Sequence, residues 1–231
     1  MPTSVIGGGS SGLGRFIAGR FAERGDEVII TSRDAARARA VAAEIGGTTR
    51  GLAVTVAQPA TIAAALADID EVDNLVLTAF APTPVTLHDF DITDAVAAIT
   101  VKLVGYTEVV RCLHSRLSDN AAVVLFGGLA KDRPYPGSTM VTTRNAGISG
   151  LVKTLAVEIA PHRVNALHPG VVADSPRWRD VPDHPAIGRT PTKRLVTMAD
   201  VADVADATEF LLRNPGVNGH DLALDAGMII T

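Results

Sequence analysis

The chain has 231 residues, of which 47 % are hydrophobic and 4 % aromatic, so a sizeable core must be built mainly from Ala, Val, Leu and Ile. The formal net charge of −4, without any block of Lys and Arg, argues against a nucleic-acid surface or an anionic-membrane surface. The single Cys112 excludes an internal disulfide, and no run reaches the roughly 18 apolar residues of a membrane span. We therefore expect a cytoplasmic protein that binds neither nucleic acid nor membrane.

Short β-rich runs alternate with longer helical patterns along the chain. The expected strands are 4–6, 27–31, 51–56, 74–78, 121–126, 163–167 and 221–224, and the expected helices are 12–25, 34–45, 59–69, 92–117, 140–160 and 200–213. This alternation predicts an α/β fold of the Rossmann type: a doubly wound parallel sheet in three layers, forming one domain over residues 1–231. Residues 172–198 lack a clear period, which is typical of a lid or substrate loop.

A glycine-rich loop, "GGGSSGLG" over residues 7–14, joins the first expected strand to the first expected helix. Glycines permit positive φ and let the backbone approach a pyrophosphate, while the helix N-terminus offers N–H groups to an anion. The strand–turn–helix context therefore predicts a dinucleotide site. Its expected members in this loop are Gly8, Ser10, Ser11, Gly12, Leu13 and Gly14.

The end of the second strand indicates which dinucleotide binds. An acidic residue at this point would hold a ribose 2′-hydroxyl, but the chain reads Thr31-Ser32-Arg33-Asp34. If Ser32 stands at the acidic position, Arg33 can pair with a 2′-phosphate, which favours NADP(H). The alternatives are Asp34 on the ribose, which implies NAD(H), and an Arg33 that is merely solvated.

Three blocks in order resemble the short-chain dehydrogenase/reductase family over nearly the whole chain. They are the glycine loop, "GLVKTLAVEIAPHRVNALHPGVV" (150–172) and "VNGHDLALDAGM" (217–228). The resemblance implies an NAD(P)-dependent oxidoreductase acting on a small molecule. It also implies a homodimer or homotetramer whose helices at 92–117 and 140–160 pair between subunits. The further cofactor contacts that it implies are Ala79, Asn145, Pro169, Gly170 and Val172.

The same resemblance assigns the four catalytic positions of the family, which normally hold Asn, Ser, Tyr and Lys. Here they fall on Lys102, Gly128, Val141 and Asn145. No Tyr or Lys occurs between Pro136 and Gly150, so no shift of register restores the pair. Because a positioned general acid contributes about 10²–10⁴ in rate, we expect an atypical member that cannot reduce carbonyls by the usual tetrad.

Two residues are candidates to replace the missing acid. A desolvated Lys102 can have a depressed pKa and act as an acid or an anion binder, and Tyr135 lies in a turn six residues before Val141. Each has a simpler interpretation: a lysine whose ammonium turns to solvent or to a neighbouring carboxylate, and a tyrosine that packs in a turn between two prolines. We expect His168 to be structural. The alternative function is a catalytically inactive NADP(H)-binding sensor, scaffold or partner protein.

Overall fold

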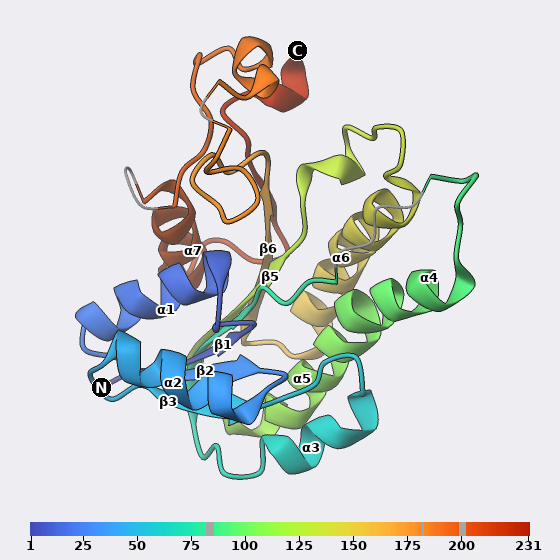
Figure 1. Ribbon diagram of the computed structural model, residues 1–231. Coiled ribbons are helices and arrows are strands. Elements are labelled where there is room, and N and C mark those ends of the chain that lie inside the picture. Colours follow the sequence, from blue (N-terminus) through green and yellow to red (C-terminus); the bar gives the residue numbers. More distant parts are fainter. Residues whose placement is uncertain (82–85, 182, 199–201) are drawn as a thin grey trace.

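The computed structural model describes residues 1–81, 86–181, 183–198 and 202–231. Within them one parallel sheet runs in the order β3-β2-β1-β4-β5-β6-β7 (Figure 1). Its strands are β1 (Thr3–Gly7), β2 (Glu27–Ser32), β3 (Arg50–Ala53), β4 (Val72–Leu77), β5 (Leu117–Phe126), β6 (Arg163–Pro169) and β7 (Asp221–Leu224). The order reverses between β1 and β4, so the sheet is doubly wound, and the predicted fold class is confirmed.

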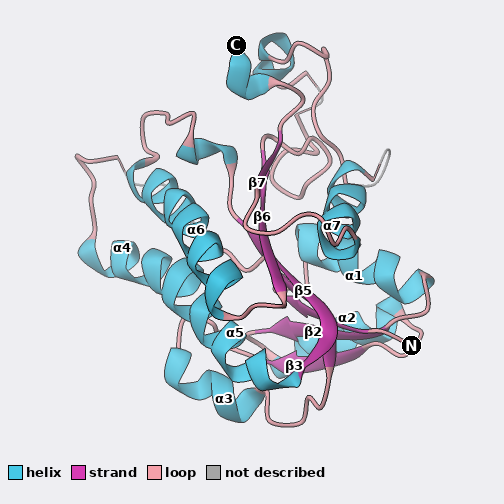
Figure 2. Ribbon diagram, turned by 180° about the vertical axis from the view of Figure 1, so that it is seen from behind, coloured by secondary structure: helices cyan, strands magenta, loops and turns pink. Residues whose placement is uncertain are grey.

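Helices cover both faces of the sheet. They are α1 (Gly12–Glu23), α2 (Ala35–Ile45), α3 (Ile62–Ala65), α4 (Ile92–Ile99), α5 (Tyr106–Leu113), α6 (Thr139–Glu158) and α7 (Asp203–Arg213). One apolar cluster joins the sheet to α3, α5 and α6, and a second joins it to α1, α2 and α7. Figures 1 and 2 show the two helix layers from opposite sides. No described helix is both long and apolar enough to cross a membrane.

Three expected elements differ from the structure in their bounds. The strand expected at 51–56 ends at Ala53, because its only neighbour in the sheet, β2, ends at Ser32 opposite it. The helix expected at 59–69 shrinks to a 3₁₀ turn, Pro59–Thr61, followed by α3. Residues 200 and 201 of the last expected helix lie outside the described residues, and α7 begins at Asp203.

The helix expected at 92–117 consists of α4, a π-helical turn over Thr100–Gly105, and α5, and it ends at Leu113. A 3₁₀ turn, His114–Arg116, follows, and Leu117 already belongs to β5. Gly105 explains part of this irregularity, because a Cβ there would lie 2.4 Å from the carbonyl oxygen of Val56. The glycine thus lets the helix press against the chain that follows β3. π-Helical turns of this kind are frequent at functional sites, and this one contains Lys102.

The loop expected at 172–198 contains a 3₁₀ turn, Pro185–Arg189, and a bridge between Val172 and Val196. Its Ala186 and Leu195 pack with Leu129 and Met228 in a small apolar cluster of their own. Figure 1 shows this loop, in orange, beside the C-terminus.

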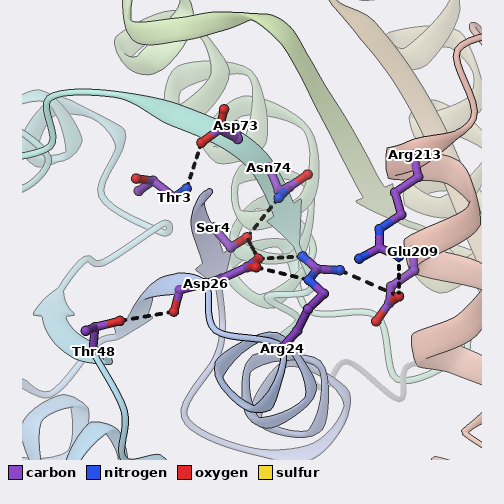
Figure 3. A network of polar contacts seen from close by, with 9 residues as sticks. All are labelled: Thr3, Ser4, Arg24, Asp26, Thr48, Asp73, Asn74, Glu209 and Arg213. Atoms are coloured by element: carbon purple, nitrogen blue, oxygen red, sulfur yellow. Dashed lines mark hydrogen bonds and ion pairs between the residues drawn. The ribbon is translucent and has the colours of Figure 1, made fainter. Parts of the chain in front are cut away.

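A polar network lies at the amino ends of the strands (Figure 3). The buried carboxylate of Asp26 accepts hydrogen bonds from Ser4 Oγ, at 2.6 Å, and from Arg24 Nε, at 3.0 Å. Arg24 also lies 3.6 Å from Glu209 of α7, and Asn74 of β4 donates to Ser4 Oγ at 3.0 Å. This network joins β1 and β4 to α1 and α7.

Candidate functional site

The glycine loop is shaped for close approach by a ligand. Gly8 and Gly12 have φ of +80° and +52°, the left-handed region that favours glycine. A Cβ on Gly14 would lie 2.5 Å from both the Gly8 carbonyl oxygen and Thr78 Oγ1, so only glycine lets α1 begin against the loop. The Thr78 hydroxyl also donates to the Gly7 carbonyl at 2.9 Å. This tight cradle fits a pyrophosphate.

The start of α1 leaves its first N–H groups available to such an anion. Ser11 precedes the helix in an extended conformation, and its side chain makes no capping hydrogen bond in the described structure. Ser11 is exposed, whereas Ser10 is buried and Leu13 packs against the apolar cluster under α1. Within the loop, Ser10 and Leu13 are thus turned toward the protein, and the backbone of Ser11 lies at the start of the helix.

Two arginines follow β2: Arg33 directly after the strand and Arg37 on the first turn of α2. Ser32 is buried and Arg33 is exposed. The Asp34 carboxylate caps α2 by accepting the backbone N–H of Arg37 at 2.6 Å. Arg37 Nη2 in turn donates to the Ser10 carbonyl at 3.3 Å, next to the glycine loop. Sequence reasoning missed Arg37; its position on the first turn of a capped helix was the available signal.

The opposite wall comes from the segments after β4 and β6. Ala79 lies against Gly8, since a Cβ on Gly8 would be 2.9 Å from the Ala79 nitrogen. β6 ends at Pro169, and the next N–H, of Gly170, donates to the Leu224 carbonyl at 2.9 Å. Val172 is fixed by its bridge to Val196. Of the predicted residues on this wall, Gly170 is thus bonded to β7, Val172 is bridged to another residue of its loop, and Ala79 lies against the glycine loop.

Two of the four positions that the resemblance assigns to catalysis are in contact. A Cβ on Gly128 would lie only 2.7 Å from Nδ2 of Asn145, which is buried on α6. The backbone of Gly128 is extended, so the amide of Asn145, and not the backbone conformation, restricts the side chain here. Val141 lies half-buried one turn earlier on α6.

Lys102 is buried, with 4 % of its surface exposed. Its Nζ donates to Tyr106 Oη at 3.1 Å and to the Ala79 carbonyl at 3.4 Å, and Tyr106 Oη donates to the same carbonyl at 2.7 Å. Burial, followed by the positive charge of Arg144, lowers the pKa of Lys102 to about 7. Burial also raises the pKa of Tyr106. Near neutral pH, Lys102 can therefore either hold or release a proton.

Arg144 was not predicted as a site residue, yet it lies in the same region. It is buried on α6, its Nη1 donates to the Ala81 carbonyl at 2.6 Å, and its guanidinium carbon lies 5.4 Å from the centre of the Phe80 ring. Together with Lys102 and Tyr106 it holds the segment that follows β4. Lys102 and Tyr106 are four residues apart, in the π-helical turn and at the start of α5, whereas Arg144 comes from α6.

In the described structure Tyr135 makes no hydrogen bond to Lys102 or Tyr106, but it is close enough to Arg144 to act on the pKa of that residue. Half of its surface is exposed, and it lines a cavity of about 440 Å³. Ser138 and Thr142 of the same cavity are hydrogen-bonded to one another at 2.9 Å, and Thr142 donates to the Ala130 carbonyl. Lys102 does not line this cavity. The structure thus gives Tyr135 access to solvent and Lys102 the perturbed pKa.

No group of three His, Cys, Asp or Glu residues is arranged for a metal ion in the part of the chain that the structure describes.

Comparisons with known proteins agree with this arrangement. Residues 8–229 match the sequence profile of a family described as enoyl-(acyl carrier protein) reductase. The chain is 28 % identical to the 3-oxoacyl-[acyl-carrier-protein] reductase of Bos taurus, with 98 % of each chain covered.

Two solved structures cover almost the whole chain. One is a short chain dehydrogenase from Burkholderia cenocepacia in complex with NADP, with a TM-score of 0.89, 25 % identity, and 98 % of this chain and 97 % of that chain covered. The other is 3-ketoacyl-(acyl-carrier-protein) reductase from Brucella melitensis complexed with NADH, with a TM-score of 0.85, 26 % identity, and 99 % and 98 % covered. The glycine loop, the doubly wound sheet and these matches show that the chain belongs to the short-chain dehydrogenase/reductase family of oxidoreductases.

Proposed function

We propose that this protein is an NADP(H)-binding oxidoreductase with a non-standard active site. The observation that carries the proposal is a contrast within the site. The glycine cradle is complete, whereas Lys102, Gly128, Val141 and Asn145 stand where the family tetrad would be. The proposal takes residues 1–231 as a single cofactor-binding domain, with 172–198 as its substrate loop.

The preference for NADP(H) rests on the end of β2. Arg33 is exposed directly after the strand, and Arg37 donates to the Ser10 carbonyl of the loop. The two guanidinium groups suit a 2′-phosphate. The Asp34 carboxylate caps α2, which makes it a weaker candidate for the ribose hydroxyl of NAD(H). Related structures contain either NADP or NADH.

The cofactor preference is tested by calorimetric titration with NADP⁺ and NAD⁺. Arg33→Ala should weaken NADP⁺ binding about tenfold, since a charge-assisted contact to phosphate is worth about 1.5–3 kcal/mol when well made and less at an exposed site. NAD⁺ binding should stay unchanged. Arg39→Ala, which removes an exposed arginine of α2, is the matched control and should affect neither. Equal binding of the two cofactors to the wild-type protein would contradict the preference.

In such an enzyme the bound nicotinamide supplies or accepts the hydride, and the chain must orient it and manage a proton. Lys102 has a pKa of about 7, which suits proton transfer at neutral pH. However, its amine is buried and donates to the Ala79 carbonyl at 3.4 Å. Tyr135 is accessible beside the cavity. We propose these two residues as the candidate proton donors, and Asn145 as a binding residue for the cofactor.

The candidates are separated by measuring NADPH consumption with a panel of carbonyl compounds, quinones and enones. Loss of the proton donor, by Lys102→Met or by Tyr135→Phe, should lower kcat about 10²-fold or more. Lys153→Met, an exposed lysine of α6, is the control and should leave kcat unchanged. If both donor variants retain wild-type turnover, neither residue is the donor.

A second function, an NADP(H)-binding protein without turnover, is favoured by the contact between Gly128 and Asn145. The space that a serine side chain would need at position 128 is taken by the Asn145 amide. Saturable NADPH binding without consumption by any member of the panel would select this function. Turnover that depends on Lys102 or Tyr135 would exclude it.

We also propose a homodimer or homotetramer. Val96 of α4, Val104 of the π-helical turn and Val157 of α6 are at least half exposed, with 59 %, 50 % and 78 % of their surfaces accessible. Pairing of these helices between subunits would cover them. Sedimentation velocity should therefore give an assembly of two or four chains, and Val104→Lys with Val157→Lys should shift it toward the monomer.

A further inference from the structure

We propose that His168 is a positioning residue that joins two loops of the candidate cofactor site and makes cofactor binding sensitive to acid. The inference rests on the proposed function. His168 is the penultimate residue of β6 and is completely buried. The turn Pro169-Gly170 follows it directly, so any movement of the histidine reaches the wall of the site.

The imidazole ring is bonded on both sides. The backbone N–H of Gly128 donates to Nδ1 of His168 at 3.1 Å, so Nδ1 carries no proton. The proton of the neutral ring must then be on Nε2, which lies 3.0 Å from Asp221 Oδ1. His168 thereby connects β7, through Asp221, to the loop after β5.

The loop after β5 is fitted to this ring. A Cβ on Gly127 would lie 2.2 Å from Nδ1 of His168, so no larger residue can stand there without displacing the ring. The next residue, Gly128, contacts the Asn145 amide. The contact from Gly128 N–H to Nδ1 therefore acts directly on the residue where the family serine would be, beside the hydrogen bond from Gly127 N–H to the Leu167 carbonyl.

The charged groups that face His168 come from two neighbouring elements. Asp221 belongs to β7, whereas Lys131 and Asp132 lie at the end of the short turn Leu129–Lys131 that follows Gly128. Lys131 Nζ is 2.6 Å from Asp132 and 4.0 Å from Asp221. Burial is the largest effect and lowers the pKa of His168, against the hydrogen bond and charge of Asp221. The ring is therefore neutral at pH 7.

Acid changes the contact with Gly128 in a definite way. When Nδ1 takes up a proton, it becomes a donor that faces another donor, the Gly128 N–H. The hydrogen bond is lost and the two groups repel, so Gly128 must move away from the ring. The movement alters the Gly128–Asn145 contact next to the expected position of the nicotinamide.

The test compares two variants. In His168→Asn the side-chain Oδ1 can accept from Gly128 in place of Nδ1, and it does not titrate. In His168→Leu the acceptor is lost at every pH. His88→Asn is the control, because His88 lies exposed far along the chain. NADP⁺ affinity is measured by calorimetry from pH 5 to 8, with circular dichroism at each pH to confirm folding.

We expect the wild-type protein and His88→Asn to lose about tenfold more affinity in acid than His168→Asn, which corresponds to the loss of one hydrogen bond. The comparison with His168→Asn is needed because the 2′-phosphate itself titrates near pH 6, as phosphate esters do. His168→Leu should bind weakly throughout. Identical profiles for the wild-type protein and His168→Asn would overturn the proposal.

A second readout needs no cofactor. The amide resonance of Gly128 should titrate in the wild-type protein with the protonation of His168 and should stay fixed in His168→Asn. If the folded protein binds no NADP⁺ at any pH but this resonance titrates, the proposed function fails while the contact stands. If the resonance does not follow His168, the positioning role is wrong whatever the cofactor does.

Discussion

The two ends of the sheet differ in whether a buried charged side chain has an oppositely charged partner. At the amino ends, Asp26 is bonded to the guanidinium of Arg24, and Ser4 donates to the same carboxylate (Figure 3). At the carboxyl ends, Lys102 donates to a carbonyl and a phenol, and no described carboxylate forms an ion pair with it. The nearby charge that acts on its pKa is that of Arg144, which is also positive.

This difference separates a structural charge from a functional one. Removing one partner of a buried ion pair is costly, because it leaves the other charge uncompensated. A buried lysine without a carboxylate loses stability when charged and acquires a pKa suited to proton transfer. On this comparison the network around Asp26 has a structural role and holds the sheet to its helices. Lys102 lies at the opposite end of the sheet, where the candidate functional site is.

The largest expected effect is at the amino ends. Asp26→Ala should lower the free energy of unfolding by about 3 kcal/mol, because Arg24 would lose its buried partner and Ser4 its acceptor. Denaturant unfolding measures this. Glu44→Ala, which breaks the exposed pair with Arg15, is the control and should cost less than about 1 kcal/mol. Equal costs would show that the Asp26 network is not a main source of stability.

Lys102→Met should change the free energy of unfolding in the opposite direction. The variant should raise the free energy of unfolding by about 2 kcal/mol at pH 7, because an apolar side chain replaces a buried amine. The folded pKa is lowered to about 7 from 10.5, so the unfolded chain binds more protons between these values. Wild-type stability should therefore rise relative to Lys102→Met, by up to about 1.4 kcal/mol per pH unit, as pH increases through this window. A difference that does not vary with pH would contradict the uncompensated charge.

Gly128→Ser tests how closely position 128 packs against the side chain of Asn145. The new Cβ would meet the Asn145 amide at 2.7 Å, so we expect a loss of about 1 kcal/mol, at the low end of overpacking costs because a side chain can yield. Asn145→Ala in the same chain should relieve most of this loss. The interaction free energy from the double-mutant cycle is the measurement, and additive effects would show that the two positions are independent.

The smallest expected effect is the contribution of His168 to the pH dependence of stability. Its pKa is lowered by burial, so the stability it contributes is complete above about pH 6.5 and is lost as pH falls below that value, where the unfolded chain binds the extra proton. The thermal midpoint of the wild-type protein should therefore fall more steeply between pH 6.5 and 5 than that of His168→Asn. Parallel curves would mean that His168 does not titrate differently in the folded state.

The fold was predictable because its determinants are local. Short β-rich runs predicted each of the seven described strands, helical patterns predicted the longer helices, and the glycine composition predicted the turn after the first strand. The predicted bounds of helices and strands were wrong where tertiary contacts determine them. β3 ends because β2 ends, and the π-helical turn forms where Gly105 meets Val56.

The site was only partly predictable for the same reason. Lys102 was a candidate, and Tyr106 lies four residues later on the same predicted helix, where helical spacing brings the two together. Arg144 could not be predicted as a neighbour, because it comes from α6, 42 positions along the chain (144 − 102). The role of His168 depends on Gly128 and Asp221, which belong to loops and strands far apart in sequence. Contacts of this kind require the fold to be known.

The most direct test of this account is a pH titration of the Lys102 side chain by carbon NMR of its Cε, with and without NADP⁺. The account predicts a midpoint near pH 7 in the free protein, and a higher midpoint when the anionic cofactor binds beside Ala79. A midpoint near 10.5 that is the same in both states would contradict it, because Lys102 would then be an ordinary charged lysine with no part in the site.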